Sequence, residues 1–427
     1  MSAPLSEHRA LVWLQTTGGI VVVLLLVQFL TGILLAFYYV PSVDHAHATV
    51  SYIEKVVSSG SWLRSLHHYG SQWLALFVFL HVVRLFLSKA YVDRTIAWFA
   101  AVLMLGLVMA AAGTGYSLPW DARAFFSTRV AEGLMSGLPL IGRNARFWVL
   151  GGNDISTITL SRFFAVHVLI VPFAIAGMIF WRFRGHACWA NVGRNAIAGG
   201  VVFIGLAIWC AKFPAPLGPP VETMTADYLP RPSAQFLWLY ELLKYVPGGL
   251  GSIVGVILPG IGLAILLLLP RLKAQRLLGS AILAALAAII LTMTIVSYVS
   301  DRSNSHTREQ LAKQAAEEAK WRNEPFNPQL LQASQRETQT ANGAPVMYMK
   351  YCVNCHGPHG EGAQQGTLRF PPLLDVAAKP QRTTEDIVSL LKDPAAYGLQ
   401  PPMRSFKDKL TEDQMREIAA WVVQLKR

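Results

Sequence analysis

Long apolar segments separated by short polar loops dominate the first three hundred residues of the chain. A helix needs about 20 apolar residues to cross a membrane. Seven segments approach or exceed that length, and they cover residues 18–40, 71–89, 95–112, 162–182, 194–211, 246–269 and 277–299. The pattern therefore predicts seven membrane-spanning helices. The first segment is long and lacks a small-residue cleavage site, so we expect a retained helix rather than a removed signal peptide.

After residue 300 the apolar pattern ends. Residues 301–345 are rich in Ala, Gln, Glu, Lys and Asn, which indicates a linker with a polar helix around residues 306–322. The remaining stretch, residues 346–427, is long enough for one small domain that a covalently attached cofactor would help to fold.

The composition agrees with a membrane protein, since 53% of the 427 residues are hydrophobic and only 15% are charged. Short loops with an excess of Lys and Arg face the cytoplasm in such proteins. Basic residues gather in alternate loops, at Arg9, at Lys89 and Arg94, at Arg182, Arg184 and Arg194, and at Arg271, Lys273 and Arg276. We therefore expect a cytoplasmic N-terminus and a C-terminal domain on the opposite, outer face. The net charge of +12 comes without the basic and aromatic pattern that indicates nucleic acid binding.

Two histidines, His67 and His81, stand fourteen residues apart within one apolar segment. Fourteen helical residues make roughly four turns and rise about 21 Å, so both imidazoles leave the same helix face at two membrane depths. His167, in another predicted span, would give the His67 level a partner from a facing helix. An imidazole in hydrocarbon is costly and indicates function by default. The spacing therefore predicts two cofactor levels, one above the other.

A haem attachment motif lies in the C-terminal domain. Residues 352–356 read Cys-Val-Asn-Cys-His, the C-x-x-C-H pattern in which Cys352 and Cys355 bind the porphyrin and His356 binds the iron. A redox or zinc C-x-x-C pair is the alternative, and the lack of a second cysteine pair downstream argues against it. We expect Met403, in a later loop, to be the sixth ligand. The competing methionines are Met347, Met349 and Met415.

A closing helix is predicted to begin at Thr411, where Thr411 and Gln414 form a capping box. The whole tail resembles a single-haem cytochrome c domain, in which such a helix packs across the fold. The other two cysteines, Cys188 and Cys210, are isolated and indicate no disulfide framework.

Three stretches of the membrane part carry a second resemblance. They are residues 64–67 (Arg-Ser-Leu-His) with His81, residues 114–121 (Thr-Gly-Tyr-Ser-Leu-Pro-Trp-Asp), and residues 159–167, which end at His167. Together they resemble cytochrome b of the bc and bf complexes. The resemblance implies an all-α fold, a seven-helix transmembrane bundle followed by the small α-helical cytochrome c domain. The implied parts are a haem-binding four-helix part at 1–185, a three-helix part at 186–300, the linker at 301–345 and the cytochrome c domain at 346–427.

The resemblance implies a complete haem b site near the outer face. Its axial ligands would be His67 and His167, Gly32 and Gly115 would lie beside the ring, and Arg64 would hold a propionate. Two unrelated histidines satisfied within the bundle are the alternative.

Two glycines on the first span, Gly18 and Gly32, repeat the spacing of fourteen. The missing side chains would let a porphyrin edge approach the backbone at both depths. Close helix packing through small residues is the alternative. The extra haem of bf complexes, attached through a cysteine on helix one, is not expected because Thr16 occupies the matching position.

The site near the cytoplasmic face departs from the family, which places a second histidine on helix four, fourteen or fifteen residues after the first. Trp181 and Arg182 occupy those positions here, and Ala101 stands where related proteins have a glycine. Neither Trp nor Arg replaces imidazole on iron in the usual way. His81 then has three alternatives: no haem, a five-coordinate haem, or a haem shared with His186 across a distorted helix. We expect an altered or absent inner haem.

The outer quinol site also departs from the family. The family motif Pro-Glu-Trp-Tyr is replaced by Pro-Ser-Ala-Gln at residues 232–235, so the carboxylate that helps to take a proton from quinol is missing. Nearby residues that would substitute are Tyr228, Asp227 and Glu222, although the two acids are ordinary solvated loop charges in the alternative view. The resemblance implies quinone contacts at His186, Pro119 and Trp120.

Both departures weaken the bifurcated quinol oxidation of the family. We hypothesise an electron-transfer subunit of a bc-like respiratory complex in the bacterial cytoplasmic membrane, which links one haem b and one covalent haem c to partner redox proteins or a quinone. Two haems b in a conventional quinol:cytochrome c oxidoreductase subunit with a full Q cycle is the main alternative, and an inert anchor for the c domain is the third. The resemblance implies an oligomeric complex with a Rieske-type iron-sulfur protein and further c-type cytochromes, surrounded by membrane lipid.

Overall fold

Seven long apolar helices form the membrane part of the protein within the residues that the structure describes. The structure, a computed structural model, describes residues 16–152, 155–183, 192–221, 228–272, 275–332, 344–357, 359–365, 368–374, 382–399, 403 and 405–425. The spans are Thr17–Ala36, Gly60–Leu87, Thr95–Tyr116, Thr157–Trp181, Val192–Lys212, Ile253–Arg271 and Arg276–Ser303. Each corresponds to one predicted segment. The prediction of seven spans is confirmed, and the chain is a multi-pass membrane protein.

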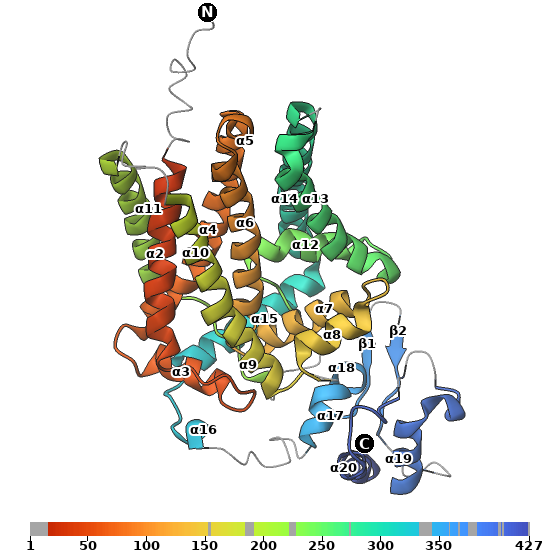
Figure 1. Ribbon diagram of the computed structural model, residues 1–427. Coiled ribbons are helices and arrows are strands. Elements are labelled where there is room, and N and C mark those ends of the chain that lie inside the picture. Colours follow the sequence, from red (N-terminus) through yellow and green to blue (C-terminus); the bar gives the residue numbers. More distant parts are fainter. Residues whose placement is uncertain are drawn as a thin grey trace, which may run out of the picture.

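Five spans pack around one apolar core and run side by side in Figure 1. They are α2 (Thr17–Ala36), α4 (Gly60–Leu87), α6 (Thr95–Tyr116), α11 (Val192–Lys212) and the fourth span, made of α9 (Thr157–Ala165), a π-helical turn (Val166–Ile170) and α10 (Val171–Phe183). The core includes Leu24, Val78 and Cys210, whereas Cys188 lies outside the described residues. Helix α4 begins well before residue 71 because its polar first turns are buried, and the Ser65 hydroxyl accepts the Ala215 N–H (2.8 Å).

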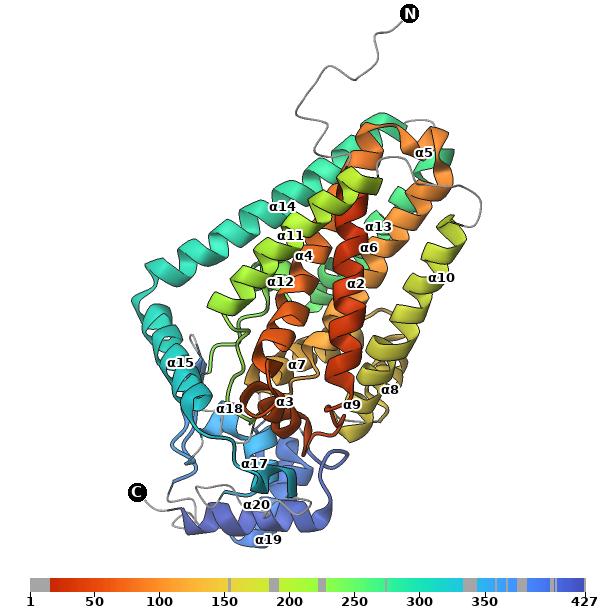
Figure 2. The ribbon, with the colours of Figure 1, turned by 90° about the vertical axis from the view of Figure 1, so that its left-hand side faces the viewer.

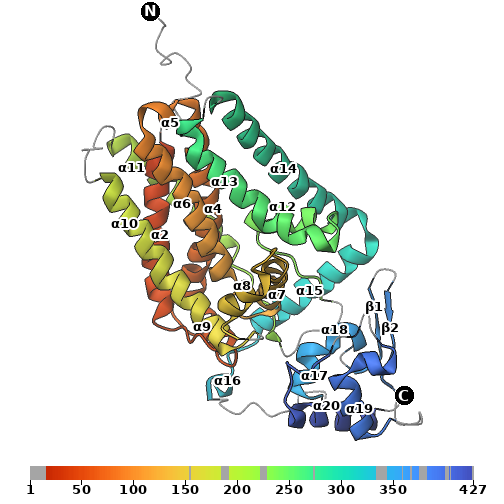
Figure 3. The same cartoon turned by 45° about the vertical axis from the view of Figure 1, so that its right-hand side comes forward.

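The last two spans form a second group beside α6 (Figure 3). This group consists of α12 (Ala234–Lys244), a 3₁₀ turn (Gly248–Leu250), a π-helical turn (Ile253–Ile257), α13 (Leu258–Leu268), a 3₁₀ turn (Leu269–Arg271) and α14 (Gln275–Ser303). The indole N–H of Trp98 donates to the carbonyl of Leu266 (2.8 Å) and joins α6 to α13. The sixth span begins later than predicted because Pro247 and the two glycines after it interrupt the helix.

The C-terminal domain lies beyond one end of the bundle, which we call the outer end, and α2 begins at the other, inner end (Figure 1). Short helices α3 (Ala46–Lys55), α7 (Ala122–Ser136) and α8 (Gly142–Leu150) cover the outer end, and α5 (Ala90–Asp93) lies at the inner end. The polar helix expected around residues 306–322 is present as α15 (Ser305–Asn323), followed by α16 (Gln329–Gln332). Figure 2 shows α15 at the outer end, between α14 and the C-terminal domain.

The C-terminal domain is a small helical unit with one β-hairpin. Its elements are α17 (Val346–Tyr351), α18 (Val353–His356), the antiparallel strands β1 (Ala363–Gln365) and β2 (Leu368–Phe370), α19 (Thr384–Lys392), a 3₁₀ turn (Pro394–Tyr397) and α20 (Glu412–Gln424). The rings of Tyr348 and Trp421, 4.4 Å apart, tie α17 to α20. Thr411 and Gln414 form the expected capping box. The all-α class and the closing helix are therefore confirmed.

Candidate functional site

Two histidines from different spans lie next to each other in the outer half of the bundle. His67 is on α4, and His167 is in the π-helical turn of the fourth span. Their ring centroids are 6.0 Å apart and their ring planes are inclined by 77°. A π-helical turn adds one residue to the helix and often occurs at functional sites. The structure thus brings together the two imidazoles that we predicted as axial ligands.

Hydrogen bonds determine which nitrogen of each ring is available. The Thr31 hydroxyl donates to the carbonyl of Val27 (2.6 Å), so its oxygen accepts the Nδ1–H of His67 (2.9 Å). Nδ1 of His167 donates in the same way to the carbonyl oxygen of Ala111 (2.9 Å). Such partners fix the tautomer and the orientation of a metal-binding imidazole. Both rings therefore keep the Nε2 lone pair for a metal ion.

Glycines make room for both rings. A Cβ atom added at Gly32 would lie 3.1 Å from Cε1 of His67, and one added at Gly115 would clash with the ring of His167. We predicted that these glycines leave space for a porphyrin edge. In the structure their first neighbours are the imidazoles. A larger residue at position 115 would displace the ring of His167, and one at position 32 would crowd the ring of His67.

The outer pair fits a six-coordinate haem iron. Two metal–imidazole bonds of about 2 Å, one on each face of a porphyrin, place the ring centroids about 6 Å apart. The observed separation of 6.0 Å agrees with that arrangement. The two rings line a largely apolar cavity of about 300 Å³, and Gly32, Gly115 and Phe164 line it as well. An apolar cavity with two opposed imidazoles suits a haem that carries single electrons.

Three arginines line the same cavity: Arg64, Arg123 and Arg231. Arg64, which we predicted to hold a propionate, forms a buried ion pair with Glu54 of α3, and its Nη2 donates to the carbonyl of Ala215 (2.6 Å). Part of its hydrogen-bonding capacity is therefore already used by the protein. Arg64 lines the cavity of the two histidines, and a protein carboxylate already balances its charge.

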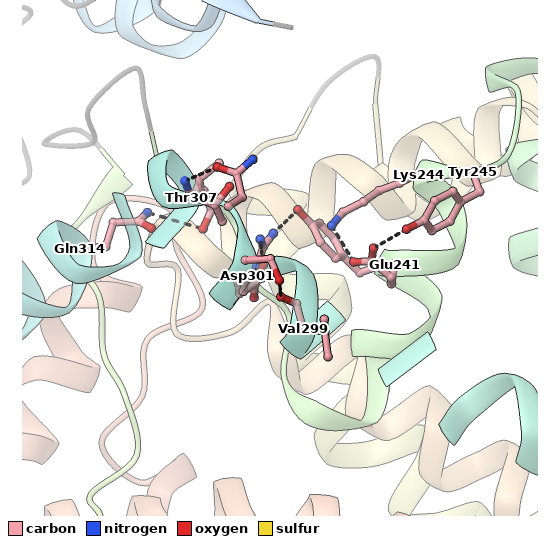
Figure 4. Close-up of polar contacts among 12 residues, drawn as sticks. Glu241, Lys244, Tyr245, Val299, Asp301, Thr307 and Gln314 are labelled. Carbon is pink, nitrogen blue, oxygen red and sulfur yellow. Dashed lines mark hydrogen bonds and ion pairs between the residues drawn. The ribbon is translucent and has the colours of Figure 1, made fainter. Parts of the chain in front are cut away.

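Arg231 lies just before the altered quinol motif and contacts the end of α14. Its Nε donates to Asp301 (3.0 Å), and the same two side chains form an ion pair. Figure 4 shows Asp301 close to α12, where Glu241 accepts hydrogen bonds from Lys244 (2.6 Å) and from the Tyr245 hydroxyl (3.1 Å). Burial opposes ionisation of Glu241, but these bonds outweigh it and keep the pKa of Glu241 below its usual value.

Sequence reasoning does not identify Arg123 and Glu318. Arg123 of α7 pairs with Glu318 of α15, and the Glu318 side chain is only 11% exposed. Burial raises the pKa of Glu318, and the charge of Arg123 partly offsets this effect. Arg123 follows the recognised stretch 114–121 closely enough to have been considered. Glu318 gives no such signal, because it is one of several acids on a polar helix.

The inner level repeats half of the outer arrangement. The hydroxyl oxygen of Thr17 lies 3.0 Å from Nδ1 of His81. A Cβ atom added at Gly18 would lie 3.1 Å from Cε1 of the same ring. Both contacts reproduce those of the threonine and the glycine beside the outer histidine of α4. The α2–α4 half of an inner haem site is therefore preserved.

The fourth span does not repeat at the inner level. Because the π-helical turn adds one residue, the position fifteen residues after His167 returns to its helix face, and this position is Arg182. Trp181 is 49% exposed, as expected for a residue on the lipid-facing side. Ala101 is buried in the packed core between α4, α6 and α13. His186, the other candidate partner of the inner level, lies outside the described residues.

The altered quinol motif faces the same cavity as the outer histidines. Ser233 and Gln235 line it, and their buried Oγ and Oε1 atoms have no hydrogen-bond partner among the described residues. Pro119 lines the cavity too. Trp120 instead packs edge-on against Phe125 (6.0 Å) in the neighbouring core. Of the predicted quinone contacts, Pro119 lines the cavity and Trp120 does not, and His186 lies outside the described residues.

The residues that would replace the missing carboxylate are only partly described. Tyr228 stacks on Phe126 with ring centroids 5.7 Å apart. Burial raises the pKa of Tyr228, so its hydroxyl is a poor proton acceptor at neutral pH. Asp227 and Glu222 lie outside the described residues.

The C-x-x-C-H motif lies where α17 passes into α18. Nδ1 of His356 lies 3.0 Å from the carbonyl oxygen of Pro371, which leaves Nε2 for iron. Burial raises the pKa of Cys352 to about 12, with a smaller contribution from Cys355. A redox C-x-x-C pair needs the opposite shift. Met403 is half-buried against the domain core. The described residues therefore fit haem c better than a redox pair.

Two stretches of the chain match known families. Residues 1–184 match the family described as Cytochrome b/b6/petB, and residues 340–426 match the family described as Cytochrome c. The chain is 34% identical over 167 residues to a cytochrome b6 of Prochlorococcus marinus (strain MIT 9215), covering 39% of this chain and 77% of that protein. It is 34% identical over 174 residues to the menaquinol:cytochrome c reductase cytochrome b subunit of Bacillus subtilis (strain 168), covering 40% and 78%. A solved chain of a hyperthermophilic respiratory Complex III has a TM-score of 0.49 and 19% identity, covering 67% of this chain and 91% of that chain.

Proposed function

The chain belongs to the cytochrome b/b6 family and carries a cytochrome c domain, and from this premise we propose that it is a membrane electron-transfer subunit of a bc-like respiratory complex. The two families imply haem b and haem c as its cofactors. In this proposal the subunit holds one haem b at the outer level and one covalent haem c. It passes electrons between them and partner redox proteins or a quinone.

The facing pair of His67 and His167 is the observation that carries the proposal. Both rings offer Nε2 to a metal within one cavity. At the inner level the fourth span supplies Trp181 and Arg182 instead of an imidazole. A six-coordinate inner haem then lacks an axial ligand from this span, so electrons have no regular haem path across the inner half of the membrane.

The altered outer motif supports the same proposal. Ser233 and Gln235 can hydrogen-bond to a polar ligand in the cavity, but neither titrates near neutral pH, so neither can take a proton from quinol. Electron transfer between haems needs no such proton acceptor. A quinol at this cavity would therefore be bound by hydrogen bonds without being readily oxidised in the bifurcated reaction.

The arrangement in the cell follows from the topology and the relatives. We infer parts at residues 1–185, 186–300, 301–345 and 346–427, with the N-terminus in the bacterial cytoplasm and the c domain on the outer face. A similar protein is named as a subunit of a menaquinol:cytochrome c reductase. This supports a multi-subunit redox complex for this chain, with a Rieske-type iron-sulfur protein and further c-type cytochromes as partners.

One observation favours the alternative of a conventional quinol:cytochrome c oxidoreductase subunit with two haems b. The contacts of His81 with Thr17 and Gly18 reproduce those of the outer ligand. Binding of a second haem b by His81 would explain why these contacts are present at the inner level. An inner ligand from outside the described residues, such as His186, would complete it.

Counting haems in the purified protein tests the proposal. Each chain should contain one haem c, so the ratio of haem b to haem c should be about one. A ratio of about two would establish the alternative, and a ratio of zero would leave an inert anchor. Quinol-driven reduction of cytochrome c that responds to outer-site inhibitors would also favour the alternative.

A further inference from the structure

Each of the three arginines at the outer cavity is matched by a carboxylate that does not itself line the cavity. Arg64 pairs with Glu54 and Arg123 pairs with Glu318, in both cases with the acid largely shielded from solvent. Arg231 pairs with Asp301. Arginine stays charged at any pH a protein encounters. Asp121 lines the cavity as well and acts on Arg123. The field inside this largely apolar cavity therefore depends on how completely the paired acids and Asp121 cancel three fixed positive charges.

Glu318 comes from a segment that neither family match includes. It is on α15, between residues 184 and 340, the inner limits of the two matched stretches. It is also the acid of α15 that faces the bundle, since Glu317 is exposed and the Glu309 side chain is 68% exposed. The cation at Arg123 thus lies in the cytochrome b part, and its counter-charge is added by the helix that leads to the c domain.

Several contacts hold α15 in place against the bundle. Lys55 donates to the carbonyl of Trp321 (2.6 Å), and the ring of His47 packs on the Trp321 ring at 5.4 Å. The Gln314 amide donates to the carbonyl of Leu229 (3.5 Å), one of the contacts drawn in Figure 4. These contacts lie on both sides of Glu318 along the helix. They fix the position of its carboxylate relative to Arg123.

We propose that Glu318 is a positioning residue that sets the reduction potential of the outer haem b by neutralising Arg123. The proposal rests on the proposed function, because it requires a haem between His67 and His167. Reduction adds one electron to the haem. A positive charge nearby stabilises the reduced form, and a cavity with low dielectric constant transmits this effect more strongly than water does. Glu318 adds its charge to that of Asp121 in balancing Arg123, so the outer haem is harder to reduce than it would be without Glu318.

Redox titration of the full-length protein with its haems bound tests this assignment. Glu318→Gln removes the negative charge and keeps the shape of the side chain. Its haem b midpoint potential should rise, while the haem c potential and the ratio of haem b to haem c should stay as in the wild type. Glu309→Gln, on the exposed face of the same helix, is the matched control and should shift neither potential.

A double variant separates charge from structure. Arg123→Gln with Glu318→Gln removes both charges, so its haem b potential should return toward the wild-type value. If Glu318→Gln holds its haem b and the potential does not move, or if haems b and c shift together, the assignment is wrong. If Glu318→Gln loses haem b, Arg123→Gln is titrated in its place. It leaves the charge of Glu318 unbalanced and should lower the haem b potential, so an unchanged or raised potential there also contradicts the assignment. Wild-type protein without haem b would instead contradict the proposed function itself.

Discussion

The outer and inner levels of α4 offer a comparison within one molecule. At the outer level His67 donates to Thr31, lies beside Gly32 and faces His167. At the inner level His81 has the corresponding threonine and glycine. The two levels differ on the fourth span, which carries an imidazole at one depth and Trp181 with Arg182 at the other. The two levels therefore share the contacts between α2 and α4 and differ in the residues that the fourth span contributes.

The comparison shows that a haem site of this kind has two separable halves. Helices α2 and α4 meet in the same way at both levels, where a glycine and a neighbouring threonine of α2 contact a histidine of α4. At the inner level the fourth span contributes little to packing at Trp181, which is 49% exposed. Sequence change can therefore remove one half of a site without disturbing the helix pair that forms the other.

The largest expected effect comes from removing an outer ligand. His167→Ala removes an axial ligand. It should therefore lower the affinity for haem b by more than the roughly 10–100-fold that is typical when a hydrogen-bond partner of a ligand is removed, and haem b content should fall accordingly. His81→Ala should change haem b content little. Pyridine haemochrome spectra measure both, with haem c as the internal reference. Equal losses of haem b in the two variants would mean that the levels are equivalent.

Rebuilding the inner level is the converse test. Arg182→His combined with Ala101→Gly supplies the missing imidazole and the missing space, so the ratio of haem b to haem c should rise from about one toward about two. Arg182→Gln with Ala101→Gly is the matched control and should not gain a haem. If the histidine variant folds with its outer haem and still binds no second haem, the explanation of what the inner level lacks is wrong.

A smaller effect is expected at the threonines. Thr31→Val removes the acceptor of the His67 Nδ1–H and should weaken retention of haem b by about tenfold, the low end for an outer-shell partner. Thr17→Val makes the same change beside His81 and should leave haem b retention unchanged. Transfer of haem b to apomyoglobin measures retention in both. A similar loss in the two variants would show that the inner histidine also holds a haem.

The smallest effect is a dependence of the outer potential on pH. Burial raises the pKa of Glu318 above its usual value, and Arg123 opposes this shift. Protonation of Glu318 as the pH falls removes its negative charge, so the haem b midpoint potential should rise. The other groups that act on this carboxyl are Asp121, Tyr228 and Arg322. In Glu318→Gln the rise should be smaller, and an identical slope in both proteins would contradict the role of Glu318.

The sequence was most informative where a local pattern of residues determines the structure. Seven apolar runs predicted the seven spans, and the fourteen-residue spacing of His67 and His81 placed both on one helix face. The local capping pair at Thr411 predicted the start of α20 correctly. In these cases the deciding interactions lie within one element or follow from the membrane itself, so neighbouring residues contain enough information.

The sequence was least informative where distant segments meet. The π-helical turn at His167 contacts α6 through the hydrogen bond of His167 to Ala111, and no residue pattern within the turn predicts it. Helix α4 begins early because Arg64 is buried against Glu54 and Ala215. Glu318 reaches Arg123 across 195 positions of the chain, so its burial could not be read from a polar helix.

An experimental density map of the haem-loaded protein tests the central claim most directly. The account predicts one porphyrin in the outer half of the bundle, with His67 and His167 as its axial ligands, and none with two axial ligands at the depth of His81. A porphyrin held on both faces at the depth of His81 would contradict the claimed difference between the levels. A bundle without porphyrin between His67 and His167 would contradict the account as a whole.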